Sequence, residues 1–484
     1  MHDLVVRGGR VVDPASGADG LLDLAVTDGR VVEVGAALEG RAVLDASGCV
    51  VAPGFVDLHS HSQSLAGHRL QALDGVTTSL ELEAGVSRVD LAYSAAGREG
   101  RPLHYGFSAS WAAARMAVLA GVEADGRLAT LLAHLGDASW QRAADPRQQQ
   151  AVLALVQRDL AAGALGIGVI LGYAPATGPE EYLAVAQLAA EVGRPTYTHA
   201  RDLVEFAPSA LIDGAQELVQ VAAETGAHMH YCHVNSTSLR AVNRVLVLVD
   251  KVRAEGATVT TEAYPYGAGS TGIGAAFLAP ERLAERGLRP TDLVYARTGE
   301  RVADEARLRH LRSTDPGGLC LVHFLDEDDE ADRALLLRSM AFPNSSIASD
   351  AMPITWQETP QEDAWPLPAT AFSHPRTAGT FAKSYRRLVR ETQLVDVAEF
   401  VRRASVRPAE VLAAATGGRI RKGTLAVGAD ADVTVLDLDV YSDMATYESL
   451  MPSVGVRHLL VDGTPVVREG YLQLGALPGR AVRA

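Results

Sequence analysis

The sequence predicts an α/β fold, namely a (β/α)8 TIM-type barrel with a β-sandwich domain built from both chain termini. Two patterns support this prediction. Short alternating strands with tight turns occur at both ends of the chain, and the long middle part alternates apolar strands with amphipathic helices. With 484 residues, the chain is long enough for a barrel and a second domain.

The β-sandwich domain is predicted from residues 1–53 together with residues 418–484. The segments DLVVRGGRVVDP and DLAVTDGRVVEVG alternate valine with polar residues around Gly-Gly and Asp-Gly turns, which is typical of β-hairpins. VRHLLVDGTPVVREGYLQ near the C-terminus has the same pattern. We therefore expect both ends to share one domain, with the barrel inserted between them.

The barrel is predicted over residues 54–417. Apolar segments such as GFVDLHSH, GVTTSLELE, GALGIGVI and TVTTEAYPY alternate with helical stretches such as GPEEYLAVAQLAAEVG, which is typical of parallel βα units. Residues 271–345 fit this alternation poorly, and we expect an insertion there that carries helices. A doubly wound open sheet is the alternative, but no glycine-rich phosphate loop follows the first strand.

Composition and charge limit the partners of the protein. The net charge of −15 and the isoelectric point of about 5.4 argue against a nucleic-acid binder and against binding to an anionic membrane surface. Neither a signal peptide nor an apolar run of about 18 residues is recognised. The three cysteines, Cys49, Cys232 and Cys320, are too few for a disulfide framework. We expect a cytoplasmic protein with a small-molecule partner, and homo-oligomer formation stays open.

Histidines at strand ends indicate a metal site. In GFVDLHSH, strand alternation places Asp57, His59 and His61 on one face. His199 follows the apolar part of PTYTHARD, and His233 follows that of HMHYCHVN. The C-terminal ends of barrel strands form the active-site face, where four imidazoles could bind one or two metal ions. A single histidine of this kind would more often be structural.

Further polar residues follow the later strands. Asp350 ends SSIASDAM, where it could accept a proton from a water acidified by a metal ion, or could cap a following helix. Arg376 lies in HPRTAGTF, and its planar guanidinium suits a carboxylate, although a structural ion pair is the alternative. The other candidates for the pocket are Tyr264, Ser270, Tyr266 and Arg201.

Taken together, these segments resemble the amidohydrolase superfamily. RVVDPASG, PGFVDLHSH and KGTLAVGADADVTVLD carry the general resemblance, and GALGIGVILGYAP, YTHARD, AYPYGAGST, ASDAMP and SHPRTAGTFAKSYRRLVRE resemble the D-aminoacylase group, the N-acyl-D-amino-acid deacylases. The resemblance implies a barrel with a β-sandwich, with Asp350 as the general base. It implies metal binding by His59, His61, His199 and His233. It also implies that the substrate carboxylate is held by Arg376, Tyr264 and Ser270.

The sequence departs from this group after the second barrel strand. Where the group commonly has Asn-Cys-Gly, this chain reads GVTTSLELEAG and has no nearby cysteine. Other superfamily members bridge two metals with a carbamylated lysine, but the first lysine here is Lys251, which comes too late in the chain. Glu81 or Glu83 could bridge instead, or the site could hold one metal. We predict Glu83, because it is nearer the C-terminal end of the strand.

The sequence therefore predicts a zinc-dependent enzyme that cleaves the amide bond of N-acyl-D-amino acids, with one or two Zn²⁺ ions. A cyclic-amide hydrolase that resembles dihydroorotases or hydantoinases is the alternative within enzymes. A metal-free binding protein on the same fold is the alternative outside them. The sequence alone does not identify the side chain or the acyl group of the substrate.

Overall fold

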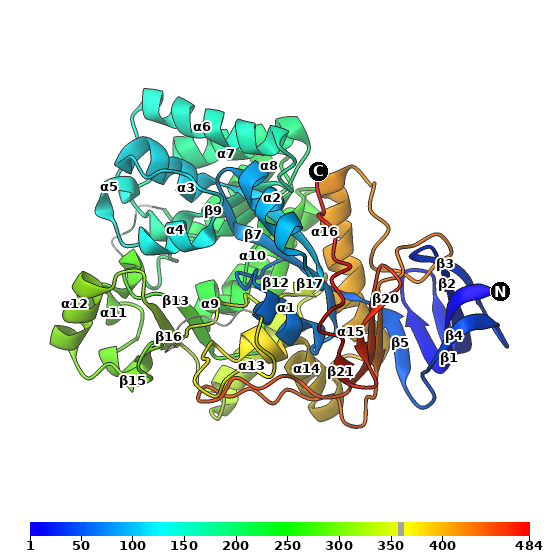
Figure 1. Cartoon of the computed structure of the whole chain (residues 1–484). Coiled ribbons are helices and arrows are strands. Elements are labelled where there is room, and N and C mark those ends of the chain that lie inside the picture. Colours follow the sequence, from blue (N-terminus) through cyan, green and yellow to red (C-terminus); the bar gives the residue numbers. More distant parts are fainter. Residues whose placement is uncertain (209, 211, 357–362) are drawn as a thin grey trace.

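The computed structural model describes residues 1–208, 210, 212–356 and 363–484. Figure 1 shows a barrel in the centre and a β-domain on the right, where the blue N-terminal strands lie beside red C-terminal strands. The two ends of the chain thus form one domain. The predicted fold class, a (β/α)8 barrel with a β-sandwich from both termini, is confirmed.

The barrel contains eight parallel strands in sequence order around the sheet. They are β6 (Phe55–Asp57), β7 (Val76–Val86), β8 (His104–Ser110), β9 (Ile167–Ile170), β10 (Thr196–His199), β11 (Met229–Tyr231), β12 (Val259–Ala263) and β17 (Ser345–Ile347). Nearly all their residues are buried, as expected for a parallel sheet covered on both faces. Just beyond the ends of β6 and β17, the His61 N–H donates to the carbonyl of Ala351 at 2.7 Å and brings the two edges together.

Helices surround the barrel and are fixed by local capping. Asp145 caps α6 by accepting N–H groups of Arg147 and Gln148 at 2.9 Å, and Pro146 begins the helix. The helices of the barrel are α1 (Leu65–Ala72), α2 (Val89–Glu99), α3 (Trp111–Arg115), α4 (Leu128–Ala133), α5 (Ala138–Gln141), α6 (Pro146–Ala161), α7 (Pro179–Val192), α8 (Gly214–Thr225), α9 (Val234–Ser238), α10 (Val242–Ala254), α13 (Glu330–Met340), α14 (Arg376–Tyr385), α15 (Val397–Val401) and α16 (Arg407–Thr416).

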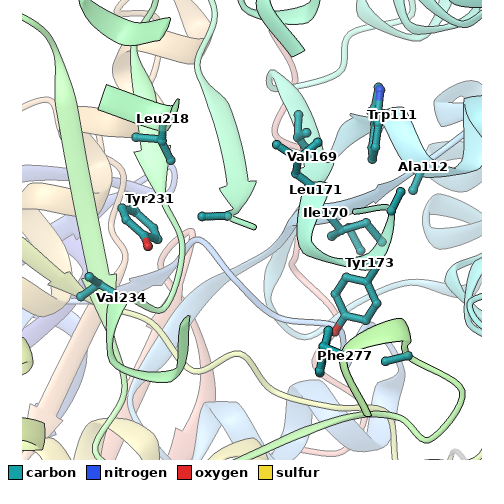
Figure 2. Close-up of a cluster of buried hydrophobic side chains, with 14 of the residues drawn as sticks. Trp111, Ala112, Val169, Ile170, Leu171, Tyr173, Leu218, Tyr231, Val234 and Phe277 are labelled. Carbon is teal, nitrogen blue, oxygen red and sulfur yellow. The ribbon is translucent and has the colours of Figure 1, made fainter. Parts of the chain in front are cut away.

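The largest apolar cluster lies between these helices and the strands. Figure 2 shows part of it, with Trp111 of α3 on the same side as Val169 of β9, on which α3 packs. Among the helices of the described ranges, none combines the length and the apolar character needed to cross a membrane.

The terminal domain contains a nine-stranded mixed sheet. Its order is β21-β20-β19-β18-β5-β1-β2-β3, with β4 paired to β1. The strands are β1 (His2–Asp13), β2 (Ala18–Thr27), β3 (Arg30–Gly35), β4 (Gly40–Asp45), β5 (Val50–Pro53), β18 (Val433–Leu436), β19 (Val456–Val461), β20 (Thr464–Arg468) and β21 (Tyr471–Leu472). The antiparallel pair of β5 with β18, in which Val51 faces Val435, joins the two ends of the chain. Val31, Val433 and Leu460 share its apolar core.

Buried charges connect the terminal domain to the barrel. Asp432, which precedes β18, accepts a hydrogen bond from His104 Nε2 of β8 at 3.0 Å and contacts Lys422 Nζ at 2.5 Å. The last residues also return to the barrel, where the Tyr93 hydroxyl donates to the carbonyl of Val482 at 2.6 Å. In Figure 1 the C-terminus accordingly ends beside α2 and α16.

The segment between β12 and β17 contains more than the helices that the sequence pattern indicated. A small antiparallel sheet has the order β13-β16-β14-β15 and lies at the lower left of Figure 1. Its strands are β13 (Ala268–Gly272), β14 (Leu293–Tyr295), β15 (Glu300–Arg301) and β16 (Leu319–His323), accompanied by α11 (Pro280–Leu283) and α12 (Glu305–Thr314). The helix α13 contacts β12 and β17 and therefore belongs to the barrel.

We propose domain limits at residues 53/54 and 417/418, beside the start of β6 and the end of α16.

Candidate active site

Six predicted residues meet at the C-terminal ends of five barrel strands. His59 and His61 follow β6, Glu83 lies near the end of β7, and His199 ends β10. The remaining two, His233 and Asp350, follow β11 and β17 in the left-handed region with φ of 30° and 50°, which turns the chain sharply after each strand. All of these side chains except His199 are buried. The barrel thus gathers residues that are up to 291 positions apart, from His59 to Asp350, into one cluster.

Glu83 lies at the centre of this cluster. Its Oε1 atom is 2.7 Å from His233 Nε2 and 3.0 Å from His199 Nδ1. Its Oε2 atom is 3.4 Å from the Nε2 atoms of both His59 and His61. The two oxygens of one carboxylate therefore contact two separate pairs of imidazoles, an arrangement suited to a carboxylate that bridges two ions.

The orientation of the first imidazole pair suits a cation. His59 Nδ1 lies 2.5 Å from Glu262, and His61 Nδ1 lies 2.7 Å from Glu81, so each Nδ1–H can donate to a carboxylate. The two Nε2 atoms then point at each other across 3.1 Å. Lone pairs in such an arrangement repel unless protons or a metal ion lie between them, and carboxylates behind Nδ1 are typical of metal-binding histidines.

The charges of the side chains in the cluster give the same indication. Burial would lower the pKa of His59, but the carboxylates of Asp350 and Glu83 raise it well above its usual range. For Glu83, burial acts to raise the pKa, whereas the imidazoles of His59 and His233 bring it well below the usual range. The cluster therefore attracts positive charge. Histidine nitrogens with carboxylate oxygens form a donor set that fits zinc.

Asp350 and Arg376 lie at the side of the cluster. Asp350 Oδ1 is 3.4 Å from His59 Nε2 and 2.8 Å from Nη2 of Arg376. Burial opposes ionisation of Asp350, but the Arg376 guanidinium holds the pKa of this carboxyl below its usual range. Asp350 is therefore an ionised carboxylate, able to accept a proton.

Beside Asp350 lies a recess with unsatisfied donors. Arg376 is buried and stacks over the Tyr264 ring at 4.7 Å, and its Nη2 donates to the carbonyl of Ser270 at 3.3 Å. Within the described part of the chain, Nε and Nη1 of Arg376 and the Tyr264 hydroxyl have no hydrogen-bond partner. At Gly269 an added Cβ would lie 3.3 Å from the Tyr264 hydroxyl and 3.7 Å from Arg376 Nη1. Glycine thus leaves space next to donors that suit a carboxylate.

The other two predicted pocket residues have different surroundings. Arg201 borders the same cavity, but its guanidinium donates to Glu217 at 2.8 Å and to the carbonyls of Pro175 and Thr177. Few of its donors are left for a ligand. Tyr266 lines a neighbouring cavity, and its ring lies under Lys383 Nζ at 3.8 Å. The alternation of side chains along a strand could not tell which of Tyr264 and Tyr266 faces the active-site cavity, because both residues follow the end of β12.

Sequence reasoning missed Glu262 and assigned no partner to Glu81. Glu262 on β12 contacts His59 Nδ1 through one oxygen and His230 Nε2 through the other, at 2.9 Å. A carboxylate within the buried strand TVTTEAY was the signal that could have found it, since a buried charge requires a partner. His230 holds Glu262 and does not itself join the cluster.

Comparisons with known proteins identify the family of this chain. An N-acyl-D-glutamate deacylase of Alcaligenes xylosoxydans xylosoxydans is 28% identical, covering 99% of this chain and 96% of that protein. A D-aminoacylase of the same organism is 27% identical over 96% of this chain and 95% of that protein. The crystal structure of an N-acyl-D-glutamate deacylase from Bordetella bronchiseptica, complexed with zinc and a phosphonate inhibitor, superimposes with a TM-score of 0.76 at 24% identity, and all of both chains is covered. Residues 42–467 match the Amidohydro_3 profile, and the protein therefore belongs to the amidohydrolase family.

Proposed function

We propose that this protein is a zinc-dependent hydrolase that cleaves N-acyl-D-amino acids to a carboxylic acid and a D-amino acid. The proposal rests on one observation above all: the cluster around Glu83 lies directly beside the recess formed by Arg376 and Tyr264. A hydrolytic centre and a carboxylate-binding site are thus adjacent, as an N-acylated amino acid requires. The relatives named as N-acyl-D-glutamate deacylase and D-aminoacylase support the same reaction and the D configuration.

The residues that would hold zinc form two groups that share Glu83. One group has His59 and His61, and the other has His199 and His233, so the donor set can accept one or two ions. Bound zinc would act as a Lewis acid toward the acyl carbonyl and would lower the pKa of water. Glu262 and Glu81 orient His59 and His61 by accepting their Nδ1–H groups.

Asp350 is the proposed proton carrier. Its Oδ1 atom lies beside His59 and His61, within reach of a water placed at the cluster. The ionised carboxylate takes a proton from that water as the water attacks the acyl carbon. The protonated Asp350 then donates the same proton to the leaving amine nitrogen, so the carboxylate is regenerated.

The recess is the proposed site for the substrate carboxylate. The Nη1 group of Arg376 and the Tyr264 hydroxyl are free to donate to it, and Ser270 lies in the adjoining strand β13. Asp350 holds the other end of the guanidinium through Nη2, which fixes the position of Nη1. The recess would fix the substrate carboxylate, and the cluster around Glu83 would fix the acyl group. The two remaining substituents of Cα, the hydrogen and the side chain, then lie in different surroundings, so the site favours one enantiomer.

A substrate panel tests this proposal. The purified protein is assayed against N-acetyl-D-amino acids, their L-enantiomers, dihydropyrimidines and hydantoins. We expect turnover of D-substrates alone. Faster hydrolysis of a cyclic amide than of any N-acetyl-D-amino acid would instead assign the site to ring opening.

We also propose a cytoplasmic location, which the three buried, unpaired cysteines support.

A further inference from the structure

The helix α14, which begins at Arg376, is interrupted after its first turn. Gly379 in its interior has non-helical backbone angles, with φ of −145° and ψ of 19°. In an unbroken helix, the N–H groups of Phe381 and Ala382 would donate to carbonyls four residues earlier. At a break such groups need other partners, because unpaired backbone groups inside a protein are costly. The first turn can therefore point in a direction of its own.

Asp74, a buried residue between α1 and β7, supplies these partners. Its Oδ2 atom accepts the Phe381 N–H at 2.8 Å, and its Oδ1 atom accepts the Ala382 N–H at 3.0 Å. A side-chain oxygen that accepts N–H groups in this way caps the start of a helix. Asp74 thus begins the second part of α14 from a different element of the barrel.

The terminal domain supplies the partner on the other side of the break. The buried Ser453 hydroxyl lies 2.9 Å from the carbonyl of Ala378 and 2.8 Å from Asp74 Oδ1. Burial raises the pKa of Asp74 well above its usual range, so its carboxyl can keep a proton and donate it to Ser453 Oγ. The Ser453 hydroxyl then donates to Ala378. One chain of hydrogen bonds therefore spans the break.

Other residues of the terminal domain press on the same point. The buried Tyr441 hydroxyl donates to the backbone carbonyl of Asp74 at 2.9 Å. An added Cβ at Gly379 would lie only 2.9 Å from Cβ of Asp443, so a larger residue at the break would push this segment away. The terminal domain therefore covers the break in α14 and fixes the residue that caps it.

The direction of the first turn matters because this turn carries Arg376. The Arg376 N–H donates to His374 Nδ1 at 3.0 Å, and its carbonyl accepts the Thr380 hydroxyl at 2.9 Å. The guanidinium then reaches Asp350 at 2.8 Å and the recess proposed for the substrate carboxylate. A displacement of about 1 Å can weaken an interaction in such a site severely. The path of the backbone at the break therefore sets the aim of the guanidinium.

We propose that Asp74 and Ser453 are positioning residues that hold the break in α14 and so aim Arg376 at the substrate carboxylate. This inference rests on the proposed function. The described lining of the active-site cavity contains neither residue, so both act through Arg376. The terminal domain thereby takes part in substrate binding, although it holds no residue of the central cluster.

The variant Ser453→Ala tests the proposal, because it removes the hydroxyl without adding bulk. We expect KM for N-acetyl-D-leucine to rise about three- to tenfold, as for one lost hydrogen bond, with kcat within about threefold and zinc content unchanged. Ser405→Ala is the matched control. The buried Ser405 hydroxyl also donates to a carbonyl at the domain boundary, that of Pro53 at 2.8 Å, but this partner lies outside α14. This control should keep the wild-type KM.

A double-mutant cycle separates positioning from a general loosening of the fold. Arg376→Met removes the guanidinium that Ser453 is proposed to aim. In that background Ser453→Ala should raise KM no further, because two changes that act through one group are not additive. A full three- to tenfold rise in the Arg376→Met background, or an equal rise in Ser405→Ala, would overturn the positioning role.

Asp74→Asn is a second variant in case Ser453→Ala fails to fold. The amide NH2 group cannot accept a backbone N–H, so one of the two bonds to α14 is lost at unchanged side-chain shape. We expect a rise in KM of the same size, and again no further rise in the Arg376→Met background. Wild-type KM in a folded Asp74→Asn variant would overturn the role of Asp74.

The outcomes also separate this inference from the proposed function. Wild-type KM in Ser453→Ala together with a raised KM in Arg376→Met would refute the positioning role and leave the proposed function intact. No hydrolysis of any N-acyl-D-amino acid by the zinc-loaded enzyme would refute the proposed function itself.

Discussion

Replacement of Glu83 by glutamine should weaken metal binding far more than the same change at Glu81. Glu83 contacts four imidazole nitrogens between 2.7 and 3.4 Å, whereas Glu81 contacts one imidazole, through His61 Nδ1 at 2.7 Å. A carboxylate behind a metal-binding histidine is typically worth 10- to 100-fold in metal affinity, about 1.4–2.7 kcal/mol, and this is the loss expected for Glu81→Gln. Glu83→Gln removes negative charge from both groups of ligands, so we expect a larger loss and at least one ion fewer per chain.

The assay measures zinc per chain after dialysis against chelators of graded affinity. Circular dichroism and the urea midpoint of each variant serve as controls for folding. Because glutamine matches glutamate in shape, both variants should keep the fold. Loss of zinc from Glu81→Gln together with retention of zinc by Glu83→Gln would show that Glu81, and not Glu83, is the central metal ligand.

Three further changes have defined outcomes. Asp350→Asn should lower kcat by about 10²–10⁴-fold at unchanged zinc content, and near-normal turnover would exclude Asp350 as the proton carrier. Arg376→Met should raise KM for N-acetyl-D-amino acids about tenfold or more, and unchanged kinetics would show that the recess does not hold the carboxylate. Asp432→Asn should cost about 1–3 kcal/mol in urea unfolding at pH 7, since it removes the carboxylate partner of His104 and leaves Lys422 with Asp430 alone. Burial opposes ionisation of Asp432, but these two partners hold its pKa well below the usual range, so its contribution is present above about pH 4 and is lost as the pH falls further. The deficit of the variant should therefore shrink in acid, and a constant deficit would contradict the ion-pair explanation.

Much of the fold follows from periodicity. The Val-rich hairpins at both ends predicted a shared domain, and β5 indeed pairs with β18. The strand β8 was not predicted, because Gly106, Ser108 and Ser110 interrupt its apolar character. The small sheet formed by β13–β16 was also missed, since β13 pairs with β16 about 50 residues further along the chain, and the only hairpin in the sheet, β14 with β15, has strands of three and two residues.

Part of the candidate site could be predicted from the sequence for a similar reason. Strand alternation and strand-end position indicated His59, His61 and Glu83, because a barrel brings all C-terminal strand ends together. Alternation says nothing about which partner a side chain selects in three dimensions. It therefore could not show that Arg201 is engaged by Glu217, or that Arg286 from the segment after α11 reaches the cavity. Such contacts depend on loop conformations that a single sequence does not specify.

The most direct test of the proposed reaction is the chirality of the product. The metal-free enzyme and the zinc-reconstituted enzyme are each incubated with racemic N-acetyl-glutamate and racemic N-acetyl-leucine, and the free amino acid is resolved by chiral chromatography. We predict no release without metal, and release of the D-enantiomer alone after zinc is restored. Release of the L-enantiomer at a comparable rate, or full activity in the metal-free protein, would contradict the proposed function.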